Sequence, residues 1–182
     1  MKIAISAIGR LRNSPEKELV DDYLSRFSKL SKPFGLSLNS VIEIEDKRGG
    51  GPISEAKLLI KTFQQNSKII ALDERGLVLS SLEFTKHLSD WAADGVGHCH
   101  LVIGGADGLD KNLLDKANLK ISFGKMVWPH MLARVMIAEQ LYRSATILAG
   151  SPYHREYPMR NLFLILITLT LTACDVPFVP FM

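Results

Sequence analysis

Three short segments of this sequence carry the residue types that hold a small ligand against the main chain. Leu72-Asp73 and Gly104-Gly105 each follow a short apolar run, and residues 123–128 follow a third. Glycines at the end of a strand let a ligand approach the backbone closely. The glycine segment lacks the spacing of the dinucleotide-binding GxGxxG motif, and no Walker lysine-serine pair follows it. The residues therefore favour a small ligand held mostly by backbone groups.

A second group of polar residues lies in the segment 126–143. Arg134 projects into the edge of an apolar helix face, where a guanidinium must find an anion or several acceptors because an unpaired buried charge is costly. Glu139 precedes Arg143 by four residues, an order that favours an ion pair. A plain core helix, with one surface ion pair and one arginine that reaches solvent, is the alternative reading.

The helix in this segment is expected to begin after Pro129, because proline fixes its own φ and moves the preceding residue out of the α region. Spacings of three and four define its predicted apolar face. That face consists of Met131, Val135, Ala138, Leu141, Tyr142 and Ala145.

The rest of the chain alternates strands and helices. Apolar runs predict strands at 2–7, 36–44, 69–72, 101–103 and 119–123. Helices are predicted after Ser14-Pro15, from an N-cap at Ser54, from a capping box at Ser80 and Glu83, and near 111–117. Such alternation predicts an α/β fold with a parallel sheet and helices on both faces. In such sheets ligands bind beyond the carboxyl ends of the strands, where the three segments lie.

Composition narrows the function classes. The 182 residues are 47% hydrophobic, enough for one packed domain, and the net charge of +3 permits an RNA partner without requiring one. Cys99 and Cys174 show no CxxC spacing, so a disulfide scaffold and a metal site are not expected, and a reducing cytosol fits. The N-terminus reads as a first strand and not as a signal peptide.

Five motifs occur in one order along the chain. They are LVIGGADGL at 101–109, WPH at 128–130, Arg134-Val135, AEQLYR at 138–143 and SPYHR at 151–155. In this order and at these separations they resemble the ribosomal RNA large-subunit methyltransferase H family, within the SPOUT superfamily of knotted methyltransferases. The resemblance covers residues 1 to about 156, and several linked motifs make it more specific than any single one.

The resemblance implies a parallel-sheet SPOUT methyltransferase fold with a C-terminal trefoil knot, a topology that the residue pattern alone would not suggest. It implies a cytoplasmic homodimer that uses S-adenosylmethionine, with no metal and no membrane partner. The implied reaction is methylation of N3 of a pseudouridine in 23S ribosomal RNA, on the assembled ribosome. The family's cofactor contacts map onto Leu72, Gly104, Phe123, Gly124, Lys125, Met126, Val127 and Trp128.

His130 and His154 are the histidines within the matching motifs, and the choice of a general base stays open between them. The imide nitrogen must lose a proton before or during attack on the sulfonium methyl group, and a base would help by roughly a hundredfold or more. His130 alternatively only orders the loop before the helix. The alternative for His154 is a place in a solvated tail. The resemblance implies instead that this tail lies over the substrate, and one arrangement has the other protomer supply it. Catalysis by positioning alone is the remaining option.

Arginines and tyrosines in the same motifs are the candidates for RNA contact. Guanidinium groups bind phosphate bidentately, and tyrosine rings stack on unpaired bases. The modest net charge suggests that shape and assembled context select the substrate. The candidate residues are Arg134, Tyr142, Arg143, Tyr153 and Arg155.

Residues 157–182 depart from the family pattern. This apolar segment resembles a lipoprotein signal peptide at the wrong end of the chain, and its apolar core is too short to span a bilayer. We interpret residues 1–156 as the methyltransferase domain and 157–182 as an atypical extension that is not a domain.

Two other functions remain open: a SPOUT methyltransferase that acts on transfer RNA, and a ribosome-binding protein without catalysis. Two structural expectations accompany the main interpretation. A side chain at Gly104 would occupy ligand space, and the apolar face of the helix at 131–145 would form the dimer interface.

Overall fold

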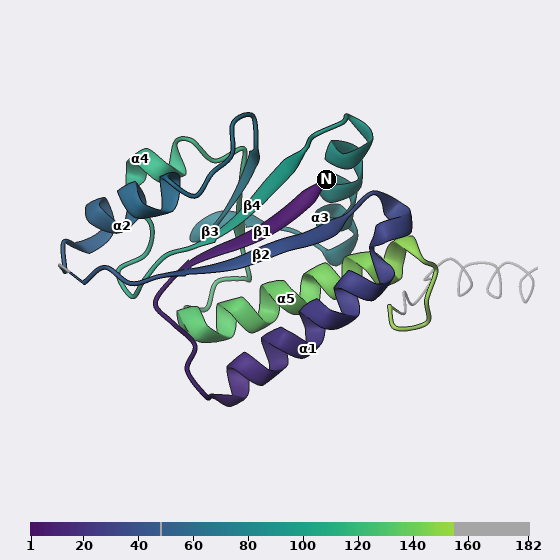
Figure 1. The fold of residues 1–182 in the computed structure, drawn as a ribbon, viewed down its shortest axis with the longest axis horizontal. Coiled ribbons are helices and arrows are strands. Elements are labelled where there is room, and N and C mark those ends of the chain that lie inside the picture. Colours follow the sequence, from purple (N-terminus) through teal and green to yellow (C-terminus); the bar gives the residue numbers. More distant parts are fainter. Residues whose placement is uncertain (48, 155–182) are drawn as a thin grey trace, which may run out of the picture.

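Five parallel strands form the sheet against which the helices pack, in a computed structural model that describes residues 1–47 and 49–154 (Figure 1). The strand order is β2-β1-β4-β3-β5, and every pairing is parallel. In chain order the elements are β1 (Lys2–Ile8), α1 (Pro15–Leu30), η1 (Lys32–Phe34), β2 (Ser37–Ile44), α2 (Gly51–Ile60), β3 (Lys68–Val78), α3 (Ser81–Ala93), β4 (His98–Ile103), α4 (Lys111–Leu114), β5 (Leu119–Ser122) and α5 (His130–Leu148).

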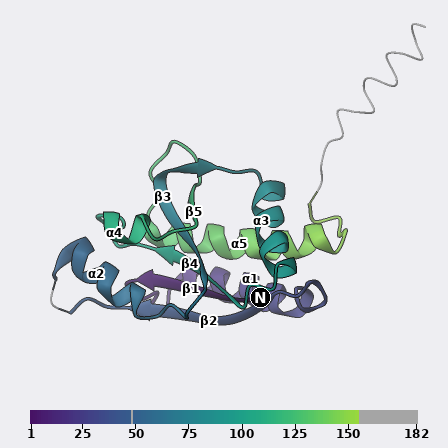
Figure 2. The ribbon, with the colours of Figure 1, turned by 90° about the horizontal axis from the view of Figure 1, so that it is seen from above.

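The helices cover both faces of this sheet, as the alternating pattern predicts (Figures 1 and 2). Because side chains alternate across a strand, neighbouring residues enter different cores. Ile70 of β3 packs with α1, α3 and α5, whereas the adjacent Ile69 and Ala71 pack with α2 and α4. The strands β1 and β4 are thus buried between two apolar layers, with every residue after the first buried in each.

Two of the predicted helix starts are confirmed by their capping contacts. Ser14 accepts a hydrogen bond from the Lys17 amide, and Pro15 follows it in the first turn of α1. At α3 the capping box is complete: the Ser80 hydroxyl accepts from the Glu83 amide, and the Glu83 carboxylate accepts from the Ser80 amide. These local signals need no tertiary context, so the sequence alone shows them.

Several boundaries differ from the prediction, among them the start of β4 at His98 and the end of α4 at Leu114, and two other shifts bear on the site. β3 does not end near Leu72 but continues to Val78, with a shift of register before it pairs again with β5. A Cβ on Gly76 would lie 2.6 Å from the backbone carbon of Ile121, so only glycine permits this close pairing. The helix expected to start at Ser54 begins instead at Gly51, and the Asp46 carboxylate accepts a hydrogen bond from the Gly50 amide just before it.

α5 begins just after Pro129 as expected, but its buried face is wider than predicted. Ala138, Leu141 and Ala145 are buried, whereas Met131 is 39% exposed. Polar residues of α5 are also buried. Among them is Ser144, whose hydroxyl accepts a hydrogen bond from the Thr85 hydroxyl of α3 at 3.0 Å. The face assigned to a dimer interface packs within the chain against α1, α3 and the sheet, so that assignment is wrong (Figure 2).

Some expectations fall on residues that the structure does not describe. Arg155 and the extension 157–182 lie outside the described residues. Within residues 1–47 and 49–154, no helix has the length and hydropathy needed to cross a membrane. The same part of the chain contains no cluster of three or more histidine, cysteine or acidic side chains that could hold a metal ion.

Candidate functional site

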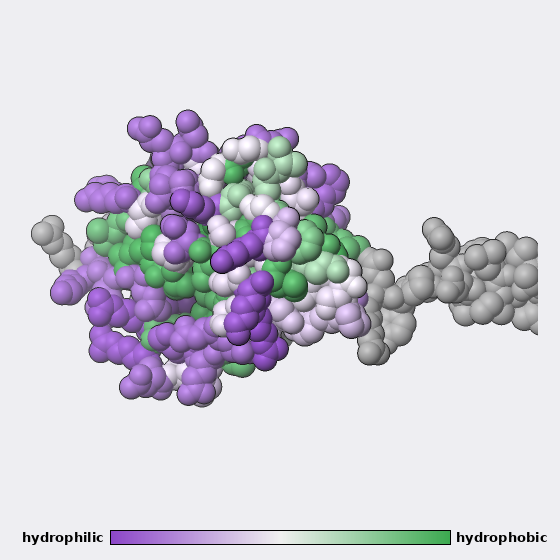
Figure 3. Space-filling model, turned by 45° about the vertical axis from the view of Figure 1, so that its right-hand side comes forward, coloured by the Kyte–Doolittle hydropathy of each residue, from purple (hydrophilic) through white to green (hydrophobic). Residues whose placement is uncertain are grey.

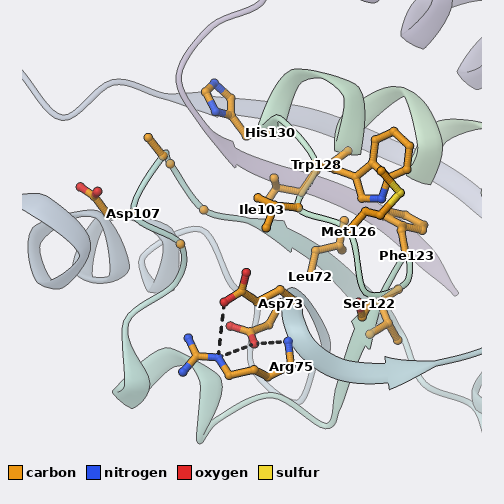
Figure 4. A pocket seen from close by; sticks show the side chains of 18 residues that line it. Leu72, Asp73, Arg75, Ile103, Asp107, Ser122, Phe123, Met126, Trp128 and His130 are labelled. Atoms are coloured by element: carbon orange, nitrogen blue, oxygen red, sulfur yellow. Dashed lines mark hydrogen bonds and ion pairs between the residues drawn. The ribbon is translucent and has the colours of Figure 1, made fainter.

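A cavity of about 290 Å³ lies at the carboxyl ends of β4 and β5 and beside the middle of β3, closed on one side by the start of α5 (Figure 4). The three segments singled out in the sequence meet here. Six of the eight predicted cofactor residues line the cavity, and Gly124 and Lys125 lie in the same loop without lining it. The six are Leu72, Gly104, Phe123, Met126, Val127 and Trp128.

The glycine loop after β4 forms one wall of this cavity. A Cβ on Gly104 would lie 2.6 Å from the Gly108 carbonyl oxygen, so a side chain would collide with the loop itself. We expected a side chain at Gly104 to occupy ligand space, but it would instead collide with the loop. Glycine at this position lets the loop fold back on itself. Gly105 donates its amide hydrogen to Glu55, which partly offsets the rise that burial causes in the pKa of the Glu55 carboxyl.

Acidic groups stand on another wall. Asp73 is largely buried, with 8% of its side chain exposed, and it accepts a hydrogen bond from the Arg75 amide at 2.9 Å. The Arg75 guanidinium nitrogen Nε lies 3.5 Å from the same carboxylate (Figure 4). Glu74 and Asp107 also line the cavity. The site therefore combines apolar side chains, carboxylates and the backbone of a glycine loop.

His130 is the candidate base that lies at this cavity. Burial, and then the positive charge of Arg134 one helical turn away, lower the pKa of His130 below its ordinary value of 6.5. The imidazole is therefore neutral over a wider pH range, as a proton acceptor must be. Gly9 brings the end of β1 beside both side chains, since a Cβ there would lie 3.5 Å from the Arg134 guanidinium and 3.9 Å from His130 Nε2.

Arg134 has internal partners for its charge. Its side chain is 2% exposed and lies 3.1 Å from the Glu43 carboxylate, and its guanidinium donates to the carbonyls of Ile8 and Gly9. The expected anion and acceptors are thus supplied inside the chain to the two terminal nitrogens, whereas the buried Nε has no partner among the described residues. The structure does not support the prediction that Arg134 contacts RNA phosphate, because the group is enclosed; it joins α5 to the ends of β1 and β2.

The remaining RNA candidates that the structure describes gather at the opposite end of α5. The Tyr142 and Tyr153 ring centroids are 4.8 Å apart, and the Arg143 guanidinium lies 4.9 Å from the Tyr153 ring centroid. Glu139 binds Arg143 at 2.6 Å, which confirms the predicted ion pair. Burial, followed by the hydrogen bond to Glu139, raises the pKa of the Tyr153 phenol to about 12.

The structure therefore separates the two candidate histidines within one chain. His130 is the first residue of the 19-residue helix α5 and His154 follows its end, so the 18 helical residues 131–148 lie between them. At 1.5 Å per residue that helix is about 28 Å long. Both ring nitrogens of His154 are buried, and neither has a hydrogen-bond partner within the described residues. A single chain cannot bring both histidines to one cavity.

Sequence reasoning missed Asp107 and Ile103 in the cavity wall, as well as Glu43. Asp107 and Ile103 flank the glycines of a motif already singled out, so proximity to a strand end was the available signal. Glu43 carried no such signal, because it lies on β2 and meets Arg134 only through the tertiary fold.

Comparison with known proteins agrees with this geometry. The profile described as "Predicted SPOUT methyltransferase" matches residues 1–154. The ribosomal RNA large subunit methyltransferase H of Cereibacter sphaeroides is 55% identical over 155 residues, which are 85% of this chain and 99% of that protein. The chain belongs to the ribosomal RNA large subunit methyltransferase H family of SPOUT methyltransferases.

Two further relatives of the same name support this assignment. The protein from Paracoccus denitrificans is 53% identical over 156 residues, covering 86% of this chain and all of that one. The protein from Ruegeria pomeroyi is 54% identical over 155 residues, covering 85% and 99%. The alignments span nearly the whole of these relatives, so the family assignment rests on complete proteins and not on a shared fragment.

Proposed function

We propose that this protein transfers a methyl group from S-adenosylmethionine to N3 of a pseudouridine in 23S ribosomal RNA within the assembled ribosome. The observation that carries the proposal is the cavity at the ends of β4 and β5 and beside the middle of β3, which six of the residues inferred from the family motifs line. Family membership over residues 1–154 supplies the reaction class.

The cavity lining fits S-adenosylmethionine. Apolar walls from Leu72, Phe123 and Trp128 suit an adenine ring and methylene groups, and the carboxylates of Asp73 and Asp107 suit hydroxyl and ammonium groups. The cofactor's sulfonium supplies an already electrophilic methyl group, so the protein has to bind and orient and need not activate the donor.

His130 is the proton acceptor that the cavity offers in one chain. Its lowered pKa keeps the imidazole neutral near neutral pH, which suits removal of the imide proton. His154 is the alternative, and in our proposal it approaches the cavity from a second copy of the chain. Arg143, Tyr142 and Tyr153 then form the RNA-facing group beside it, and the candidate Arg155 lies outside the described residues.

We therefore propose a homodimer in which the two copies of α5 place the end of one chain at the cavity of the other. The supporting argument is the helix length of about 28 Å between the two candidate histidines. Apolar side chains left exposed near the start of α5 supply a surface for the contact: Met126 is 71% exposed, Val127 79% and Leu132 38%. Figure 3 shows apolar surface gathered in a band between hydrophilic margins on one face of the molecule.

The trefoil knot and the cytoplasmic location belong to the same proposal. The succession of β5, the 123–128 loop and α5 along the cavity is the segment in which family membership would place the knot. Ribosomes are the substrate, so the site of action would be the cytoplasm.

The test is incubation of the purified protein with labelled S-adenosylmethionine and, separately, unmodified ribosomes, free 23S RNA and transfer RNA. Label in 23S RNA from ribosomes, located at N3 of a pseudouridine by mass spectrometry, is the expected result. Label in transfer RNA would favour a transfer RNA methyltransferase. Binding to ribosomes without methyl transfer or cofactor binding would favour a non-catalytic ribosome-binding protein.

A further inference from the structure

Glu139, at the middle of α5, accepts hydrogen bonds from three different side chains. Its Oε1 accepts from Arg143 Nε at 2.9 Å and Nη2 at 2.6 Å, and from the Tyr153 hydroxyl at 3.0 Å. Its Oε2 accepts from the Gln140 amide at 2.8 Å. We call Glu139, Gln140, Arg143 and Tyr153 the Glu139 cluster.

The cluster is sheltered and anchored. Only 17% of the Glu139 side chain and 26% of the Arg143 side chain are exposed, so solvent screens this ion pair less than the exposed pairs of α1 and α3. Gln140 in turn accepts a hydrogen bond from the Ser81 hydroxyl at 2.8 Å. The carboxylate is thus fixed relative to two helices before it contacts Tyr153.

Tyr153 is held by its ring and by its hydroxyl. Arg143 lies over the ring, and Tyr142 packs at a centroid distance of 4.8 Å. Among residues 151–154 as the structure describes them, the Tyr153 phenol is the side chain that hydrogen-bonds to α5, while the backbone bond from Ser151 to Thr146 closes the helix. His154 follows directly, with both ring nitrogens buried and without partners among the described residues.

We propose that Glu139 is a positioning residue for methyl transfer: by holding the Tyr153 hydroxyl it fixes the segment that presents His154 to the substrate. This inference rests on the function proposed above. A carboxylate acceptor gives a stronger and more directional bond than a neutral one, so the segment is ordered before RNA arrives. The role would be exerted through Tyr153, and Glu139 itself need not touch the RNA.

The test compares four proteins with the wild type: Glu139→Gln, Tyr153→Phe, the double variant and Asp90→Asn. Tyr153→Phe keeps the ring and removes only the hydroxyl, and it lies beyond α5, so helix folding does not depend on it. Asp90→Asn is the matched control, because it removes the negative charge of an i,i+4 ion pair of the same 2.6 Å length on the exposed side of α3. Each protein is assayed for kcat on ribosomes, for S-adenosylmethionine affinity by calorimetry, and for the Tyr153 ring-carbon NMR signal.

We expect kcat to fall about tenfold in each single variant and no further in the double variant than in Tyr153→Phe, because Glu139→Gln weakens and Tyr153→Phe removes the same hydrogen bond. Affinity for S-adenosylmethionine should stay within about twofold of the wild type, since the cavity lies at the other end of α5. The Tyr153 Cζ signal, identified by its loss in Tyr153→Phe, should move in Glu139→Gln and not in Asp90→Asn.

Three results would overturn the positioning role: a kcat for Glu139→Gln equal to that of Asp90→Asn, losses that add in the double variant, or an unmoved Tyr153 signal. Loss of cofactor affinity in Glu139→Gln would also overturn it, by showing a general structural defect. A wild-type protein that transfers no methyl group to ribosomes would instead reject the proposed function, and the positioning role with it.

Discussion

Replacement of Arg134 by methionine tests whether this arginine is structural. The guanidinium has three acceptors, the Glu43 carboxylate and the carbonyls of Ile8 and Gly9, and 2% of its side chain is exposed. Methionine fills much of the volume but leaves those acceptors unpaired. Breaking a buried ion pair costs about 3–5 kcal/mol. Glu43 is 24% exposed and keeps a hydrogen bond from the Leu11 amide, so we expect the lower end, about 3 kcal/mol.

Urea unfolding followed by circular dichroism measures this loss. With a denaturant slope of about 2 kcal/mol per molar urea, a loss of about 3 kcal/mol moves the midpoint down by about 1.5 M. Arg26→Met is the matched control, because Arg26 pairs with Asp22 on the exposed side of α1, and its midpoint should not change measurably. An unchanged midpoint for Arg134→Met, combined with weakened ribosome binding, would refute the structural role and restore the phosphate contact.

Three further predictions concern the cavity and the dimer. Gly104→Ala should lower S-adenosylmethionine affinity at least tenfold, because its Cβ would meet the Gly108 carbonyl oxygen at 2.6 Å. In the control Gly97→Ala the Cβ meets nothing within 4 Å, so calorimetry should give the wild-type affinity for S-adenosylmethionine. His130→Gln should lower kcat about a hundredfold. The wild-type rate should rise with pH through a midpoint below 6.5, since the neutral imidazole is the active form and the pKa of His130 is lowered. A midpoint at or above 6.5 would argue against His130 as the base. Leu132→Glu should give monomers by light scattering while Leu19→Glu, also at an exposed apolar position, stays dimeric; a dimeric Leu132→Glu would reject this interface.

The elements of this fold were readable from the sequence where local chemistry determines them. Ser14-Pro15 and the Ser80–Glu83 capping box mark helix starts with contacts made inside one turn. The extension of β3 beyond Leu72 was not readable, because the polar residues after it resemble a turn and pair with β5 only once that strand is in place. Gly76 shows its role only in that pairing.

The residues of the site likewise include some that the sequence pattern reveals and others that only the tertiary fold reveals. Gly104 was found because strand ends of a parallel sheet converge, a rule that acts on the pattern alone. Leu72 lies at the same cavity although β3 continues past it. Arg134 was correctly expected to need partners, but Glu43 and the β1 carbonyls that serve it are 91 to 126 residues away in the chain. The separation of His130 from His154, in contrast, follows from the length of a helix that the sequence already predicted between Pro129 and Ala145.

The most direct test of the central claim is mass spectrometry of 23S RNA from unmodified ribosomes after incubation with the wild-type protein and S-adenosylmethionine. Our account predicts one added methyl group, located at N3 of a pseudouridine, and none when free 23S RNA replaces the ribosome. A 23S RNA that remains unmethylated on ribosomes under conditions where the protein binds the cofactor would contradict it.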